Sequence, residues 1–340
     1  MFRTFIKASV AAAAVLAMSG YAGAQEYAFR FQSSDPAGNP NFEYQKAWTE
    51  LVKEKSDGKV TIELLPVGAV VEYNETLDAV AAGILDGQIC DSSYWAGKDP
   101  AFGLISNPVG AWSDPAQMID FVENGGGKEI MQEMLGSYGL HFIGVSTPGL
   151  EAFVSRVPLD GVDDLNGLKM RSPEGPIANV FAAAGAAPVN LPSSEVFTSL
   201  DKGVVDAADY SVFSVNQQQG LNEVAPNPVY PGFHSLPLVE VSMNQGKWDA
   251  LPDDIKTMLE ETVKEFQQTQ IEGNKAADLK AIEEAKANPD ITVHDWSEEE
   301  RAKFRKLGQA EWQVIAQQSP MAQKVYDTLT AYLTEKNLLQ

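Results

Sequence analysis

Residues 75–87 read ETLDAVAAGILDG, and a related pattern, EVFTSLDKGVVDA, follows at residues 195–207. In both segments a glutamate stands eight residues before a glycine, and two apolar residues and an aspartate follow that glycine. Each pattern predicts a short helix, a glycine that ends it, and the entry to a strand. Two such units far apart in the chain indicate two lobes of related build, and clefts between lobes are favoured ligand sites.

Outward from these units, the chain alternates between strand-like and helix-like patterns. We expect strands over residues 27–31, 60–65, 88–92, 140–145, 152–155, 168–171, 187–189, 204–208 and 238–243. We expect helices over 41–55, 75–83, 115–138 (interrupted by the glycines at 125–127), 176–186 and 193–202. A long amphipathic helix is expected from about 252 to 288, and a second helical block from about 297 to 339. Ser297 and Glu300 match a capping box at the start of that block. This alternation predicts an α/β fold with a helical C-terminus.

The first residues have the pattern of a secretory signal peptide. Arg3 and Lys7 precede an apolar stretch over 8–18, and the small residues Ala22 and Ala24 follow it. The apolar stretch is shorter than the roughly 20 residues that a membrane-spanning helix needs. We therefore expect cleavage after Ala24 and export to the periplasm, with an uncleaved membrane anchor as the alternative.

The charge balance excludes some classes of partner. The chain has a formal net charge of −22, which argues against binding nucleic acid or anionic lipid. An anionic ligand would need a local positive group. The three histidines, His141, His234 and His294, have no metal-site spacing, and the sequence contains neither HExxH nor GxSxG. We therefore expect no enzyme.

Arg171 is the strongest candidate for an anion-binding group. It ends the predicted strand 168–171, and residues 172–175, SPEG, turn away from it. A guanidinium at the end of a strand can bind a carboxylate through two hydrogen bonds. The residue pattern equally allows a surface ion pair with Glu174 or Asp164.

Other candidates are rings and polar side chains that follow predicted strands. Tyr94 and Trp95 come directly after one strand, and Asp209 and Tyr210 come after another. A turn at 230–235, YPGFHS, adds Phe233 and His234. Aromatic residues beside polar groups are typical of a small-ligand pocket, but they also occur in ordinary cores and turns.

Taken together, several segments resemble one known family. The segments are YWAGKDPAF at 94–102, GLKMR at 167–171, LDKGVVDAAD at 200–209 and YPGF at 230–233. They resemble the solute-binding proteins of TRAP transporters (DctP family), especially the branch that includes α-keto-acid and mannitol or chloroaromatic binders. The resemblance covers nearly the whole chain after the signal peptide.

The resemblance implies a two-lobed periplasmic binding protein with an interlobe cleft and a long bridging helix. Lobe I would contain residues 25–150 and about 237–270. Lobe II would contain 151–236 and part of the C-terminal helices, and 297–340 would form a helical C-terminal segment. Members of this branch can form dimers by exchanging C-terminal helices, so a homodimer is an open alternative.

The resemblance also assigns roles to residues. Arg171 matches the family's arginine that clamps the ligand carboxylate. Glu151 lies where the α-keto-acid binder has a glutamine, and Asp209 and Tyr210 match its acidic and tryptophan positions. Ser235 replaces a glutamate around a bound sodium or calcium ion. A cation site could persist at Glu151 and Asp209, or a charged His234 could assist Arg171 instead.

The predicted function is therefore that of an extracytoplasmic receptor. It would bind a small monocarboxylate (a 2-oxo, 2-hydroxy or aromatic acid) and deliver it to the membrane permease subunits of a TRAP transporter. The alternatives are a sugar acid or a sulfonate as ligand, or a periplasmic enzyme on the same scaffold, since a fold does not fix a function.

Overall fold

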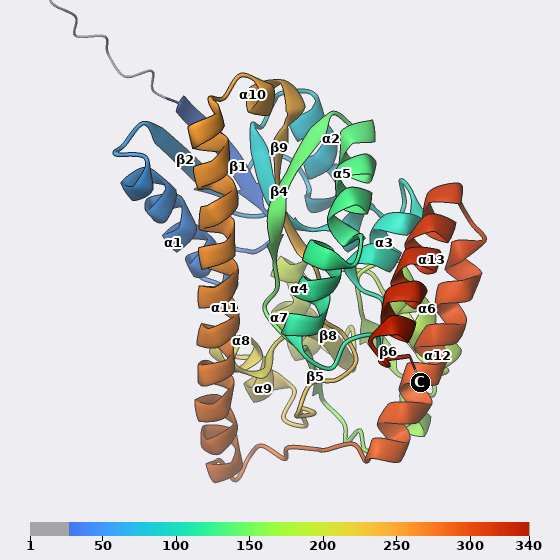
Figure 1. Ribbon diagram of the computed structural model, residues 1–340. Helices are drawn as coiled ribbons and strands as arrows, with labels where there is room; N and C mark the ends of the chain where they lie inside the picture. The colour runs from blue at the N-terminus through green and yellow to red at the C-terminus, as the bar shows by residue number, and fades with distance from the viewer. Residues whose placement is uncertain (1–26, 340) are drawn as a thin grey trace, which may run out of the picture.

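The structure is a computed structural model that describes residues 27–339, and it has two lobes, each built on its own β-sheet (Figure 1). The predicted signal peptide and its cleavage site lie outside these residues. The α/β class, the two lobes and the helical C-terminus are confirmed. Among the described residues, no helix has both the length and the apolar character needed to cross a bilayer.

The sheet of the first lobe has five strands in the order β2-β1-β3-β9-β4. Strand β1 is parallel to β2 and β3, whereas β9 is antiparallel to β3 and β4. The strands are β1 (Tyr27–Ser33), β2 (Val60–Leu65), β3 (Gly87–Asp91), β4 (Leu140–Ser146) and β9 (Val239–Asn244). Because β9 follows all the strands of the second lobe in the chain, the backbone returns to the first lobe after building the second.

The sheet of the second lobe has four strands in the order β5-β8-β6-β7. Strand β6 is parallel to β7 and β8, and β5 is antiparallel to β8. The strands are β5 (Ala152–Ser155), β6 (Lys169–Arg171), β7 (Ala187–Val189) and β8 (Ala207–Ser211). The residue boundaries that the resemblance gives to the lobes stay a prediction.

The helices that cover these sheets begin at clear sequence signals. Asn39, Asp99 and Asp114 each accept a backbone hydrogen bond as an N-cap, and a proline follows each of them. The helices are α1 (Pro40–Lys55), α2 (Thr76–Ala81), α3 (Pro100–Ser106), α4 (Pro115–Asn124), α5 (Gly127–Ser137), α6 (Pro176–Ala183), α7 (Val196–Asp201), α8 (Phe213–Gln218), α9 (Leu221–Val224) and α10 (Gln245–Asp249). Short 3₁₀ helices are η1 (Tyr73–Glu75), η2 (Ser92–Trp95), η3 (Val162–Leu165) and η4 (Ser193–Glu195).

The two related segments adopt the same local structure. In each, a 3₁₀ turn leads into a short helix, α2 or α7, and a glycine with positive φ ends it: 72° at Gly83 and 68° at Gly203. The next residue is exposed in both lobes, 56% for Ile84 and 53% for Val204. The strand then begins three residues later than predicted in the second lobe, at Ala207.

Helix α11 (Asp253–Ala287) joins the two lobes as one uninterrupted helix and runs along the full height of the molecule (Figure 1). It packs on α1 and β4 of the first lobe and on α8 of the second. The Trp48 indole donates to the Thr262 hydroxyl at 3.2 Å, and the Ser214 amide donates to Asp278 at 2.7 Å. The predicted bridging helix is therefore present.

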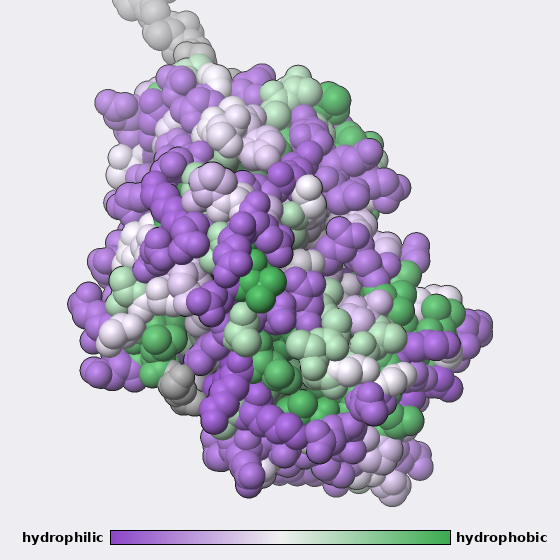
Figure 2. Space-filling view, turned by 90° about the vertical axis from the view of Figure 1, so that its right-hand side faces the viewer, coloured by the Kyte–Doolittle hydropathy of each residue, from purple (hydrophilic) through white to green (hydrophobic). Residues whose placement is uncertain are grey.

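The C-terminal block is two helices, α12 (Glu298–Ala316) and α13 (Pro320–Glu335), because Pro320 starts a new helix with Ser319 as its N-cap. Trp312 and Leu329 pack in the first lobe, and Phe304 packs in the second. The Glu300 carboxylate accepts from the Val162 amide at 2.7 Å instead of completing the capping box. Both helices thus bury apolar side chains within this chain, with no exchange needed to cover them. The face that they form is largely hydrophilic, with apolar residues in scattered groups (Figure 2).

Candidate functional site

Arg171 is buried at the end of β6 with one nitrogen left unpaired. It is 2% exposed. Its Nε donates to the Leu191 carbonyl at 3.1 Å and its Nη1 to the Asp209 carbonyl at 2.6 Å, whereas Nη2 has no hydrogen-bond partner. Within residues 27–339 no carboxylate forms an ion pair with it. A buried charged donor without a partner is costly, so the site favours an anion.

The alternative of a surface ion pair is wrong for this residue. Glu174 accepts a hydrogen bond from Asn190 at 2.9 Å, and Asp164 accepts from the backbone amides of Asp160 and Gly161, the two residues before η3. Neither carboxylate reaches Arg171, since the β6 strand places the guanidinium inside the protein.

A cleft of about 50 Å³ lies between the lobes and includes Arg171 in its lining. Strands β1 and β3 end at it from one lobe, and β6 and β8 from the other. Its lining residues are Ser34, Asp35, Asn39, Asn41, Asp91, Tyr94, Pro148, Glu151, Arg171, Ser193, Tyr210, Ser211, Pro237, Val239 and Gln270. Parallel strands present their carboxyl ends at one edge, which is where α/β proteins commonly bind ligands.

Four of the predicted residues line this cleft: Arg171, Tyr94, Glu151 and Tyr210. Burial raises the pKa of Tyr94 far above its ordinary value, although the nearby charge of Arg171 opposes the rise. Burial also raises the pKa of Tyr210 to about 12. Both tyrosines are therefore neutral hydroxyl groups at the cleft.

Trp95 and Phe233 do not line the cleft. Trp95 packs edge-on against Phe102 with ring centroids 5.7 Å apart, in the core of the first lobe. Phe233 packs in the core of the second lobe, and the Arg301 guanidinium lies 5.4 Å from its ring centroid. In the 3₁₀ turn η2, neighbouring side chains diverge, so Tyr94 lines the cleft and Trp95 does not.

Asp209 and His234 lie behind the cleft in a buried hydrogen-bonded group with Glu151 and Ser235. His234 Nε2 lies 2.7 Å from Asp209 Oδ1, and the Ser235 hydroxyl donates to Glu151 at 2.5 Å. The His234 ring stacks on Phe153 with centroids 3.8 Å apart. All four polar residues are at most 6% exposed.

The surroundings shift the pKa values of the two carboxyl groups in this cluster in opposite directions. Burial, with the negative charge of Asp209, raises the pKa of Glu151 well above its ordinary value. Burial would also raise the pKa of Asp209, but hydrogen bonds from His234 and Glu151 and the charge of Arg171 hold it below its ordinary value. The surroundings therefore favour the protonated form of Glu151 and the ionised form of Asp209, whose Oδ1 is hydrogen-bonded to His234 Nε2.

The same group is the candidate for a cation site, because Glu151, Asp209 and His234 offer ligand atoms within 4.8 Å of one another. Calcium prefers six to eight oxygen ligands. Here, in contrast, one Asp209 oxygen is hydrogen-bonded to a nitrogen of His234, and one Glu151 oxygen accepts a hydrogen bond from the Ser235 hydroxyl. Both carboxyl groups carry hydrogen bonds from the protein and the third ligand is a nitrogen, so the set is a poor match for calcium.

Several lining residues were missed from the sequence, above all Asp35, Asn39, Asn41 and Asp91. Burial raises the pKa of Asp35 to about 6 and also raises that of Asp91. Their positions carried a usable signal. Asp35 follows the first predicted strand and Asp91 falls in the strand predicted over 88–92, so both lie near strand ends, although only the sheet order brings them together.

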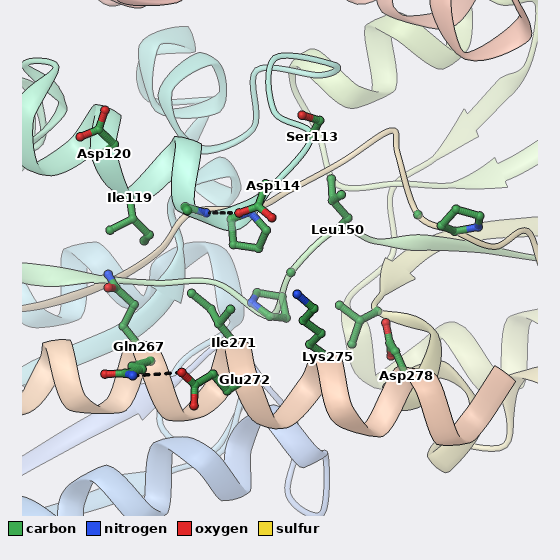
Figure 3. Close-up of a pocket in the computed structure, with 18 of the residues that line it drawn as sticks. Ser113, Asp114, Ile119, Asp120, Leu150, Gln267, Ile271, Glu272, Lys275 and Asp278 are labelled. Atoms are coloured by element: carbon green, nitrogen blue, oxygen red, sulfur yellow. Dashed lines mark hydrogen bonds between the residues drawn. The ribbon is translucent and has the colours of Figure 1, made fainter. Parts of the chain in front are cut away.

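A second and larger cavity, about 820 Å³, lies outside the cleft beside α11. Gln267, Ile271 and Lys275 point from α11 toward α4 and Leu150 (Figure 3). Its two lysines, Lys264 and Lys275, are exposed, and Lys264 pairs with Glu123 at 3.3 Å. Because no buried charge lacks a partner there, the smaller cleft with Arg171 is the better candidate site.

The fold and the cleft define a two-lobed solute-binding protein. Residues 31–319 match the sequence profile of the bacterial extracellular solute-binding proteins, family 7, and the chain belongs to this family. The predicted family is therefore confirmed, and its members serve transport and are not enzymes.

Two solved structures and one curated relative illustrate the likeness. A TRAP periplasmic solute-binding protein from Rhodobacter sphaeroides, in an apo open state, is 70% identical, with 92% of this chain and 99% of that chain covered and a TM-score of 0.75. A TRAP solute-binding protein from Bordetella bronchiseptica, a dimer with calcium and picolinate in one site, is 22% identical, with 92% and 93% covered and a TM-score of 0.85. The second likeness shows the fold alone.

The monocarboxylate 2-oxoacid-binding periplasmic protein of Nostoc sp. is 29% identical over 236 residues. The match covers 68% of this chain and 64% of that protein, so the chain spans less than two thirds of its relative's length.

Proposed function

We propose that this chain is the periplasmic receptor of a TRAP transporter, which holds a small organic acid in the cleft and delivers it to the membrane permease subunits. The unpaired Nη2 of buried Arg171 is the observation that carries the proposal. A ligand carboxylate would complete the hydrogen bonding of the guanidinium and neutralise its charge. A sulfonate or a sugar acid could do the same and remains the alternative.

In this proposal Arg171 clamps the carboxylate, and Tyr94 and Tyr210 cover it from either lobe. Asp209 acts as a positioning residue, because its carbonyl accepts from Arg171 Nη1 while its carboxylate is held by His234. This replaces the idea that His234 assists the ligand directly, since His234 does not line the cleft.

The proposal needs no bridging cation. The Bordetella protein was found with calcium beside picolinate. In this chain Glu151 and Asp209 are hydrogen-bonded to Ser235 and His234, and burial favours the protonated form of Glu151. We therefore place the carboxylate directly on Arg171.

Closure of the lobes would complete the site. Asn39 donates to the Tyr210 hydroxyl and Asn41 to the Ser211 hydroxyl, each at 3.2 Å, so the lobes are bonded across the cleft. The Rhodobacter protein, described as apo and open, has a lower TM-score at 70% identity than the Bordetella protein at 22%. A difference in how the two lobes are arranged would lower the TM-score of the Rhodobacter protein despite its higher sequence identity. Closing would exclude water and strengthen the ion pair.

The test is a thermal-shift screen of small carboxylic, sulfonic and sugar acids on the exported protein, followed by calorimetry on Arg171→Ala. We expect at least one acid to raise Tm and the variant to lose about 100-fold in affinity or more, the usual effect of removing one partner of a buried charge pair. Arg30→Ala removes an exposed arginine that pairs with Glu63 at 3.5 Å and should bind normally. Equal affinity in Arg171→Ala would refute the clamp.

A further inference from the structure

We propose, building on the proposed function, that the ligand is a zwitterion. Its carboxylate binds Arg171, and its ammonium group lies against the paired carboxylates of Asp35 and Asp91. The proposal concerns a second contact region within the cleft, opposite the guanidinium.

The sheet places the two aspartates together. Strands β1 and β3 are parallel neighbours, and Ser33 is the register partner of Ile89. Asp35 and Asp91 each follow two residues later, at the carboxyl ends of adjacent strands. Both residues line the cleft that contains Arg171. Adjacent strands are about 4.8 Å apart, so one small cation can contact both carboxylates.

Each aspartate uses only one of its oxygens within the protein. Asp91 Oδ1 accepts from the Ser93 amide at 2.8 Å and from the Ser106 hydroxyl at 2.6 Å. Asp35 Oδ2 accepts from the Gln45 amide at 2.8 Å. Within the described residues, the second oxygen of each carboxylate is left for a group in the cleft.

The charges lining the cleft do not balance. Three carboxyl groups, those of Asp35, Asp91 and Glu151, face one guanidinium, and the lining includes no lysine and no histidine. Burial favours the uncharged form of Glu151. The two aspartates remain, and burial with their mutual repulsion already raises the pKa of Asp35. A purely anionic ligand would neutralise Arg171 and leave this negative charge uncompensated.

An ammonium group corrects this imbalance, whereas a 2-oxo or 2-hydroxy group does not. A hydroxyl can donate to one aspartate but brings no positive charge. The rings of Tyr94 and Tyr210, which line the same cleft, can also contact an alkylated ammonium through their faces. The unpaired Nη2 of Arg171 is an independent sign that a ligand binds here, and the small cavity favours a compact molecule.

The decisive experiment compares acids of equal shape that differ only in charge. The protein would first be stripped of bound ligand by unfolding and refolding. Calorimetric titrations in the presence of a chelator would then compare two pairs of ligands: alanine with isobutyrate, and glycine betaine with tert-butylacetate. Pyruvate and lactate complete the series. We expect at least one zwitterion to bind about tenfold tighter or more than the acid of the same shape that has carbon in place of the charged nitrogen. The same zwitterion should also bind more tightly than pyruvate and lactate.

Two variants test the contact itself. Asp35→Asn and Asp91→Asn keep the shape of the side chains and the hydrogen bonds to Gln45 and Ser93. Each variant should reduce the affinity for the zwitterion about tenfold or more, whereas the affinity for isobutyrate should stay the same or increase. Glu63→Gln, an exposed carboxylate, is the matched control.

The outcomes separate this inference from the proposed function. If pyruvate or lactate binds tightest, or if binding appears only when calcium is restored, the zwitterion inference is wrong, but the proposed function as an organic-acid receptor is supported. If none of these acids binds and the wider acid screen also finds no ligand, the proposed function fails as well.

Discussion

Asn41 of α1 donates a hydrogen bond to the Ser211 hydroxyl of β8 at 3.2 Å, and this bond crosses from one lobe to the other. The same side chain accepts from Gln270 and Asn274 of α11, both at 3.2 Å. One buried amide therefore connects both lobes and the bridging helix. Its geometry is available only when the lobes are close together.

Replacing Asn41 with alanine should favour the open arrangement. Removing buried hydrogen bonds typically costs about 1–3 kcal/mol, which corresponds to a loss of affinity of about 5- to 150-fold. Ligand titration followed by small-angle scattering measures both affinity and lobe separation. Asn124→Ala, which removes an exposed amide bonded to Asp120, should change neither. A compact, tight-binding Asn41→Ala protein would contradict the assigned role.

Glu240 should make stability fall as pH rises. It lies fully buried in β9, where burial raises its pKa from 4.5 to about 8, although the hydrogen bond from Gln88 opposes the rise. Between these pH values the unfolded chain ionises while the folded chain keeps its proton, so alkali favours unfolding. Glu240→Gln removes this penalty.

The expected gain for Glu240→Gln is on the order of 2–4 kcal/mol at pH 8 and close to zero at pH 4.5. Urea unfolding at the two pH values measures it. Glu63→Gln, at an exposed position, should show no such difference. A gain that is equal at both pH values would mean that the carboxyl group does not titrate in this range.

Removal of divalent and sodium ions should leave ligand affinity unchanged within about twofold, because hydrogen bonds already satisfy the Glu151 and Asp209 group. Calorimetry in chelator and potassium buffer, with and without added calcium, measures this. The Bordetella protein, found with calcium and picolinate, provides the positive control. Calcium-dependent binding here would show that the group rearranges around an ion.

Gly232 should tolerate no side chain. A Cβ atom there would lie 2.3 Å from the Glu151 carbonyl and 2.6 Å from that of Leu150, where the chain crosses between lobes. Because both neighbours are backbone atoms, Gly232→Ala should destabilise the protein by about 1–3 kcal/mol and weaken ligand binding. Thermal unfolding and calorimetry measure the two effects. Gly97→Ala, where a Cβ would meet nothing within 4 Å, is the control and should behave as the parent protein.

The alternation of elements could be predicted because apolar spacing and capping residues are local signals. The start of β8 was misplaced because Val204 and Val205 look like the beginning of a strand. In the structure Val204 is an exposed turn residue after Gly203, and only Val205 packs in the core. The first lobe has the same turn after Gly83, where Ile84 is exposed and Leu85 is buried.

The site was harder to predict than the fold. Residue type suggested Trp95 and Phe233 as ligand contacts, but aromatic rings also fill cores, and the direction of each side chain depends on the turn that carries it. Asp35 was missed because one aspartate after a strand is unremarkable. Its meaning comes from Asp91 on the neighbouring strand, a relationship that only sheet order reveals.

The continuous helix α11 has a thermodynamic consequence. Two domains on a flexible linker lose much orientational freedom when they close on a ligand, and that loss weakens binding. Here one stiff helix packed on both lobes leaves few ways for them to move apart, so most of that freedom is already absent before the ligand arrives. A ligand with few atoms can therefore bind firmly, because little of its interaction energy is lost in ordering the protein around it.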